Sequence, residues 1–150
     1  MTTHSVLGAI ANSFNPLLAI LALIVPFLRT PRTARSTVTY YLSTGAAIGI
    51  VYLIRFVDDR NRLWASFGLD YSTHSAFAAS LAASIGTFDR RWAIPLAVAV
   101  VLYFALEIFM RYHGIVDIVS SAVPTAIAAL LLHNSSRVRT DSPRSPNRNT

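Results

Sequence analysis

The sequence STHSAFAASLAASIGTF at residues 72–88 is the stretch from which the fold of this chain is best inferred. Alanine and serine dominate it, and small residues recur at every fourth position, at Ala76, Ser80 and Ser84. Small side chains on one face of a helix let neighbouring helices approach closely, as they do at helix interfaces inside a lipid bilayer. We therefore expect a helix over residues 72–88 at the centre of a helical bundle.

Four further apolar runs flank this stretch, at residues 6–28, 37–54, 92–110 and 115–132. A membrane-spanning helix needs about 20 predominantly apolar residues. Of the 150 residues, 53% are hydrophobic and 13% are charged, and the mean hydropathy is +0.48. We therefore expect an all-α integral membrane bundle of about five transmembrane helices in residues 1–132. Residues 133–150 lack apolar content and are expected to form a basic, disordered cytoplasmic tail.

The composition also excludes several functional classes. A chain with so many apolar residues is neither a nucleic-acid-binding arm nor an ordinary soluble enzyme. Cysteine and lysine are both absent, which excludes a disulfide framework, a thiolate zinc site and Schiff-base chemistry. The net charge of +6 includes thirteen arginines, which are dispersed between the apolar runs. Loops that flank membrane spans explain this distribution better than nucleic-acid binding does.

The arginines also indicate an orientation, because five spans place successive loops on alternate sides of the membrane. One side receives nine of them, namely Arg29, Arg32, Arg35, Arg90, Arg91, Arg137, Arg139, Arg144 and Arg148. The other side receives four, namely Arg55, Arg60, Arg62 and Arg111. Since cytoplasmic loops carry the excess of positive charge, we expect the N-terminus outside and the C-terminus inside, as would suit a bacterial inner (plasma) membrane.

Polar residues gather at the outer ends of the second to fifth expected helices. Ionisable groups near the hydrocarbon are costly and often mark a functional site, although helix ends also carry interfacial anchors. The set comprises Arg55, Asp58, Asp59, Arg60, Arg62, Asp70, Ser72, His74, Glu107, Arg111, His113 and Asp117.

Two pairs in this set have helical spacing. His113 and Asp117 are four residues apart, so on one helix face the carboxylate would hold the imidazole in one tautomer. Glu107 and Arg111 have the same spacing, in the order that favours a helical ion pair. Either the two side chains form a structural ion pair, or Arg111 is available to bind another anion.

The residues then resemble a family, the type 2 phosphatidic acid phosphatases, in three motifs. The family motif Lys-x6-Arg-Pro matches RFVDDRNRL at residues 55–63, with Arg for Lys and Leu for Pro. The motif Pro-Ser-Gly-His matches YSTH at residues 71–74. The motif Ser-Arg-x5-His-x3-Asp matches only in its second half, HGIVD at residues 113–117, because Leu106 and Glu107 replace Ser and Arg.

This resemblance implies a membrane enzyme that acts on a lipid phosphate or a polyprenyl (di)phosphate at the extracytoplasmic face, without a metal or a cofactor. His113 would attack phosphorus and form a phosphohistidine, oriented by Asp117. His74 would protonate the leaving group and then activate water. The phosphate oxygens would be bound by Arg55, Arg62, Ser72 and Thr73, and by Arg111 in place of the missing third-motif arginine.

Two alternatives stay open at this point. In the first alternative, the chain is a degenerate relative that binds a lipid phosphate or a partner helix without turnover. The loss of the third-motif arginine would favour this alternative. Otherwise it is an unrelated bundle with a transport, scaffold or haem role, in which His74 and His113 would be axial ligands.

The expected topology can be tested directly because the chain has no native cysteine. A cysteine at Thr3 should react with a membrane-impermeant thiol reagent applied to intact cells, and a cysteine at Ser142 should react only after the cells are opened. Labelling of both positions from the same side would remove one span from the expected five.

Overall fold

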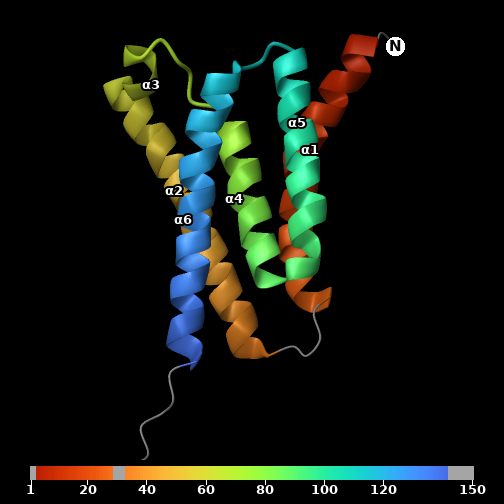
Figure 1. Ribbon diagram of the computed structural model, residues 1–150, viewed down its shortest axis with the longest axis vertical. Helices are drawn as coiled ribbons and strands as arrows, with labels where there is room; N and C mark the ends of the chain where they lie inside the picture. Colours follow the sequence, from red (N-terminus) through yellow and green to blue (C-terminus); the bar gives the residue numbers. More distant parts are fainter. Residues whose placement is uncertain (1–2, 29–32, 142–150) are drawn as a thin grey trace, which may run out of the picture.

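The computed structural model describes the backbone of residues 3–28 and 33–141, and the side chains of residues 6–28 and 33–136. Every regular element in these ranges is a helix, and the long helices stand side by side (Figure 1). This confirms the predicted all-α fold. The elements are α1 (Thr3–Leu28), α2 (Ala34–Asn61), α3 (Leu63–Ser66), α4 (Thr73–Phe88), the 3-10 helix η1 (Arg90–Trp92), α5 (Ala93–Phe109) and α6 (Ile115–Asp141).

Four described segments are long and apolar enough to cross a membrane, namely Val6–Leu28, Ala34–Asn61, Arg90–Phe109 and Ile115–Ser136. The remaining expected span, α4, has only 16 residues. At 1.5 Å per residue it is about 24 Å long, which is shorter than the roughly 30 Å of a bilayer's hydrocarbon core. The described residues therefore form an all-α membrane bundle with four segments of spanning length around the shorter helix α4.

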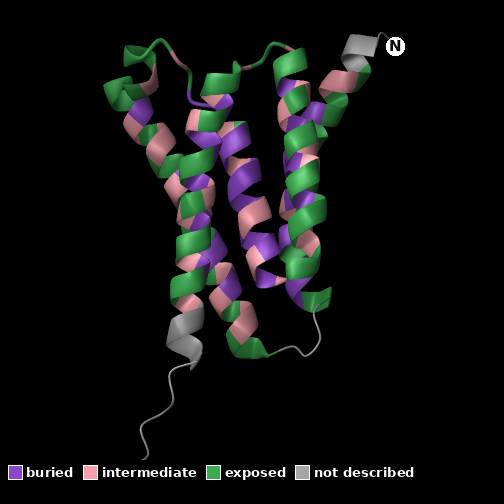
Figure 2. Cartoon of the chain, in the orientation of Figure 1, coloured by how far each residue is buried: buried purple, intermediate pink, exposed green. Residues whose placement is uncertain are grey.

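The short helix α4 lies at the centre of this bundle, as its small residues predict. It contacts α1, α2, α5 and α6, and Figure 2 shows that buried positions dominate it. Its first turn is capped by the Ser72 side chain, which accepts a hydrogen bond from the backbone N–H of Ser75. The buried residues are Ser75, Ala76, Ala78, Ala79, Ser80, Leu81, Ser84, Ile85, Gly86 and Phe88.

Two predicted boundaries are wrong. The second helix continues past residue 54 to Asn61 and so includes the polar residues that were expected to follow it. The last helix continues past Leu132 to Asp141, so residues 133–141 are helical rather than disordered. Packing explains this, because His133 is buried and the Ser136 hydroxyl lies 2.8 Å from the Ser43 hydroxyl on α2. Residues 142–150 of the expected tail lie outside the described residues.

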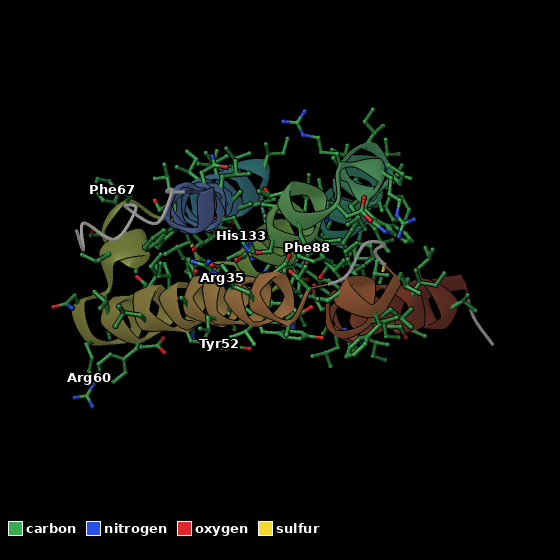
Figure 3. The ribbon with its side chains drawn as sticks, turned by 90° about the horizontal axis from the view of Figure 1, so that it is seen from below. Arg35, Tyr52, Arg60, Phe67, Phe88 and His133 are labelled. Carbon is green, nitrogen blue, oxygen red and sulfur yellow. The ribbon has the colours of Figure 1, made fainter. Side chains whose placement is uncertain are left out.

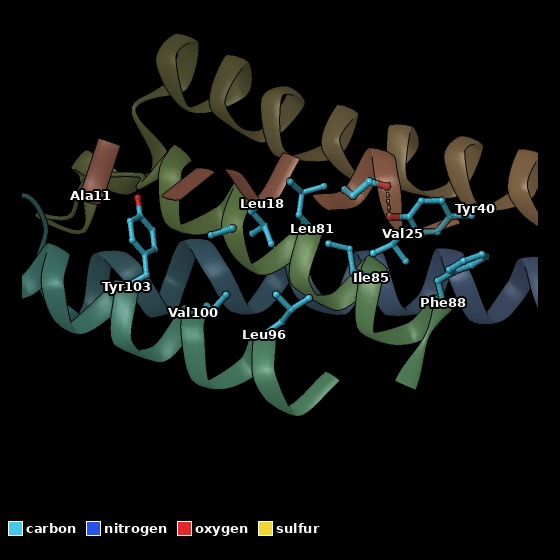
Figure 4. Packing of buried hydrophobic residues seen from close by; sticks show 12 residues of the cluster. Ala11, Leu18, Val25, Tyr40, Leu81, Ile85, Phe88, Leu96, Val100 and Tyr103 are labelled. Atoms are coloured by element: carbon cyan, nitrogen blue, oxygen red, sulfur yellow. Dashed lines mark hydrogen bonds between the residues drawn. The ribbon is translucent and has the colours of Figure 1, made fainter. Parts of the chain in front are cut away.

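A buried apolar cluster joins α4 to its neighbours at the middle of the bundle (Figure 4). Ile85 of α4 is fully buried in this cluster, together with Val25 of α1. Tyr40 of α2 donates a hydrogen bond of 3.0 Å to the carbonyl of Ala22, and its ring lies 4.5 Å from that of Phe88. Large apolar side chains also cover the outside of the bundle, as contact with lipid requires.

Replacement of Ile85 by alanine tests the role of this cluster. Because lipid is as apolar as the protein interior, the loss arises mainly from the cavity, and we expect a destabilisation of about 2 kcal/mol. Reversible unfolding with SDS in mixed micelles measures it. Ile94→Ala is the matched control, since Ile94 is 77% exposed on α5. Equal effects of the two changes would contradict the central position of α4.

Candidate functional site

The candidate site lies at the end of the bundle where α2 and α5 finish and where α4 and α6 begin (Figure 1). The three motif segments approach this end from different helices. Residues 55–61 form the last turns of α2, residues 71–74 lead into α4, and residues 113–117 lead into α6. The fold therefore brings to one end of the bundle segments that are far apart in the sequence.

Hydrogen bonds tie the segment before α4 directly to the start of α6. The backbone N–H of Asp70 donates to Asp117 Oδ1 at 2.9 Å, and the backbone N–H of Ser72 donates to Ser121 Oγ at 2.9 Å. In addition, His113 Nδ1 lies 3.6 Å from Asp70 Oδ2. The two segments that carry His74 and His113 are therefore held against each other.

The predicted contact between Asp117 and His113 is wrong. His113 precedes α6 instead of lying on it, so the spacing of four residues does not bring the two side chains together. Both oxygens of Asp117 accept backbone N–H groups, from Asp70 and, at 2.9 Å, from Gly114. A side chain at Gly114 would lie only 3.2 Å from Asp117 Oδ2, so glycine suits this tight turn. The carboxylate beside His113 is that of Asp70, which sequence reasoning gave no role.

The second-motif residues have different surroundings. Ser72 is fully buried and its hydroxyl caps α4, whereas Thr73 is half-buried. The His74 side chain is exposed and, with Thr73 and Tyr52, lines an open groove of about 290 Å³ that α1 borders. Its backbone carbonyl accepts a hydrogen bond of 3.2 Å from Asn15 Nδ2 on α1.

The four arginines at this end form two groups, which differ in whether a neighbouring side chain contacts the guanidinium group. Arg55 forms an ion pair of 2.9 Å with Asp59 one turn further along α2, and the Arg60 guanidinium lies 5.3 Å from the Phe56 ring centroid. Arg62 and Arg111 are both exposed and follow the ends of α2 and α5 with positive φ angles of 51° and 58°. Neither forms an ion pair with the described residues.

A tyrosine, Tyr71, anchors the loop between α3 and α4 to α2. The Tyr71 hydroxyl donates a hydrogen bond of 3.1 Å to the carbonyl of Val51, and its ring packs edge-on against Trp64 at 4.8 Å. Burial raises the pKa of Tyr71 to about 12, so its hydroxyl stays protonated and remains a donor at neutral pH.

Glu107 has no contact with Arg111, so the predicted ion pair is wrong. The helix α5 ends at Phe109, and Arg111 has left the helical path. Glu107 is instead 3% exposed and accepts hydrogen bonds from the hydroxyls of Ser75 and Tyr103, the latter at 2.8 Å. Asn15 Nδ2 lies 3.4 Å from the Tyr103 oxygen and extends this network to α1. A single carboxylate within an otherwise apolar run is the sequence signal for such a buried site.

Comparison of the chain with known protein families, with characterised proteins and with solved structures finds no match. Within the described residues, no three histidine or carboxylate side chains gather closely enough to hold a metal ion.

The contacts of Glu107 and Arg111 predict different effects of replacing each residue. Glu107→Ala leaves the hydroxyls of Ser75 and Tyr103 without their acceptor, which typically costs about 1–3 kcal/mol for a buried group. Arg111→Ala should change the free energy of unfolding by no more than about 0.5 kcal/mol, because this side chain is exposed. Unfolding with SDS in mixed micelles measures both. Equal destabilisation by the two variants would restore the ion-pair interpretation.

Proposed function

We propose that this chain is a membrane-bound phosphatase or phosphotransferase that acts on a lipid phosphate or a polyprenyl (di)phosphate at the extracytoplasmic face. The observation that carries the proposal is the set of hydrogen bonds between the segments of His74 and His113. A two-step phosphoryl transfer needs a nucleophile and an acid-base group near one phosphorus atom. The bonds from Asp70 and Ser72 to α6 support a shared site for these two histidines.

In the proposed reaction, Nε2 of His113 attacks phosphorus as the bond from phosphorus to the leaving oxygen breaks. His74 donates a proton to that oxygen and then takes a proton from the water, or from the acceptor alcohol, that cleaves the phosphohistidine. Asp70 faces the other ring nitrogen of His113 and orients the ring, while Asp117 holds the two segments together. The reaction uses no metal and no cofactor.

In the proposed site, the arginines at this end neutralise the negative charge of the phosphate. Arg62 and Arg111 are exposed and have no carboxylate partner among the described residues, so their guanidinium groups are available for phosphate oxygens. Arg55 would first have to exchange Asp59 for the phosphate. Ser72 and Thr73 are at the N-terminus of α4, where the helix dipole favours an anion.

A second candidate is a catalytically degenerate protein that binds lipid phosphate without turnover. The observation that favours it is the position of Glu107, which replaces the family's third-motif arginine and is bound to Ser75 and Tyr103. Detergent-purified protein distinguishes the two candidates. Release of phosphate from a short-chain lipid phosphate in the presence of a chelator, abolished by His113→Ala, supports the enzyme. Retained lipid binding without phosphate release supports the degenerate protein.

The two carboxylates at the site should differ in what they contribute. Asp70→Asn should lower kcat by no more than about fivefold, because an ion pair in which one side chain is 69% exposed is typically worth about 0.2–1 kcal/mol. Asp117→Asn should chiefly lower stability, because an amide offers one acceptor oxygen for two backbone N–H groups. Thermal unfolding in detergent and turnover per folded molecule separate the effects. A normal stability with a much lower kcat for Asp117→Asn would return the orienting role to Asp117.

A further inference from the structure

Polar groups continue from the candidate site, which we call the outer site, into the interior of the bundle. Two hydrogen bonds show how α4 and α6 are aligned, from Ser72 N–H to Ser121 Oγ and from Thr125 Oγ1 to the carbonyl of Ala76 at 3.2 Å. Each joins residues that are 49 positions apart in the sequence. The equal offset means that the two helices run in the same direction, as Figure 1 also shows, and that these two turns share one register.

Continued for two more turns, the same offset would bring Ser80 level with Ala129 and Ser84 level with His133. All four residues are buried, Ser80, Ser84 and Ala129 completely and His133 to 5% exposure. Tyr40 of α2 lies 4.5 Å from Phe88 of α4 and 5.7 Å from His133 of α6, so the two helices meet the same tyrosine near this end. We call these four levels, from Ser72 and Ser121 to Ser84 and His133, the α4–α6 ladder.

Every level of the α4–α6 ladder carries a hydroxyl group. Successive levels are four residues apart, which corresponds to a rise of about 6 Å. One water molecule that accepts from one hydroxyl and donates to the next spans about this distance, since each such bond measures about 2.8 Å. Hydroxyl groups can donate and accept at once, so a chain of them with water can pass a proton along.

The hydroxyls of Ser80 and Ser84 supply an independent reason to expect water. Both oxygens are buried, and neither has a hydrogen-bond partner within the described part of the chain. An unpaired hydroxyl in the interior of a membrane protein is costly, and buried water is the usual partner of such groups. The two unpaired oxygens belong to the two levels at which no hydrogen bond already joins α4 to α6.

Titratable groups and further hydroxyls extend the ladder at both ends. At the outer end, the Ser72 hydroxyl donates to Ser75 Oγ at 2.9 Å, and Ser75 donates to the carboxylate of Glu107. At the inner end, His133 Nε2 lies 3.4 Å from Thr44 Oγ1. One step further, the hydroxyls of Ser43 and Ser136 are 2.8 Å apart. Figure 3 shows His133 among the helices, whereas Arg60 points away from them.

We propose that the α4–α6 ladder, completed by water at Ser80 and Ser84, is a proton path between the outer site at Glu107 and the inner end of the bundle at His133. A proton enters at one titratable group, moves by exchange of O–H bonds along hydroxyls and water, and leaves at the other, so that no covalent product forms. Glu107 and His133 are intramembrane ionisable residues of the kind that mark proton relays. This activity does not depend on the proposed phosphoryl transfer.

Proton flux into liposomes tests the path with the full chain. The purified protein is reconstituted with an internal pH-sensitive dye, and a potassium gradient with valinomycin drives protons inward in the absence of any lipid phosphate. Proton influx into vesicles with the wild-type protein should exceed proton influx into protein-free vesicles. The double variant Ser80→Ala and Ser84→Ala should fall to the level of protein-free vesicles, because it removes both relay hydroxyls and leaves the packing almost unchanged.

The control is Ser13→Ala, which removes an exposed hydroxyl of α1 that bonds to the carbonyl of Ala9, and it should keep the wild-type flux. His133→Phe preserves the ring beside Tyr40 but cannot carry a proton, so it should also abolish flux. Size-exclusion profiles and thermal unfolding confirm that each variant is folded. A wild-type flux equal to that of empty vesicles, or an undiminished flux in the double alanine variant, would overturn the proposal.

Discussion

The close, parallel packing of α4 against α6 is the contact on which the rest of the structure depends. It requires a small residue at each turn of α4, because any larger side chain at Ala76 or Ser80 would push α6 away. It also sets the register in which Ser72 meets Ser121 and Ala76 meets Thr125. Since α4 contacts the other three long helices as well, its position fixes where those helices lie.

The candidate site is a direct consequence of this register. Asp117 reaches the backbone of Asp70, and Ser121 reaches that of Ser72, only because the first turn of α6 stands beside the start of α4. These bonds hold the loop between α3 and α4, which leads to His74, against the start of α6, which follows His113. Asp117 therefore acts first on the backbone, and the carboxylate next to His113 comes from the neighbouring loop. A site built in this way depends on packing within the bundle more than on the motif residues themselves.

A second constraint arises from polar groups within an apolar bundle. Glu107 accepts hydrogen bonds from Ser75 and Tyr103, so the buried carboxylate is supplied with donors from α4 and from its own helix. These contacts tie α5 to the same end of α4 that forms the candidate site. The interior therefore combines an apolar cluster around Ile85 with a polar network along one side of α4.

The sequence alone determined the apolar runs, the all-α class and the central place of α4, because composition and helical spacing are local properties. It could not determine that α2 reaches Asn61 or that α6 reaches Asp141. Asp58 near the end of α2 accepts a hydrogen bond from the backbone N–H of Trp64, and Ser136 of α6 lies 2.8 Å from Ser43 of α2, and neither contact is visible in the apolar pattern. The pairs of Asp117 with His113 and of Glu107 with Arg111 failed for a related reason. Spacing predicts neighbours only while the helix continues, and both helices have ended or not yet begun at these residues. Only the tertiary structure decided which groups meet, because Asp70 and His113, or Ser75 and Glu107, are distant in sequence and are brought together by helix packing.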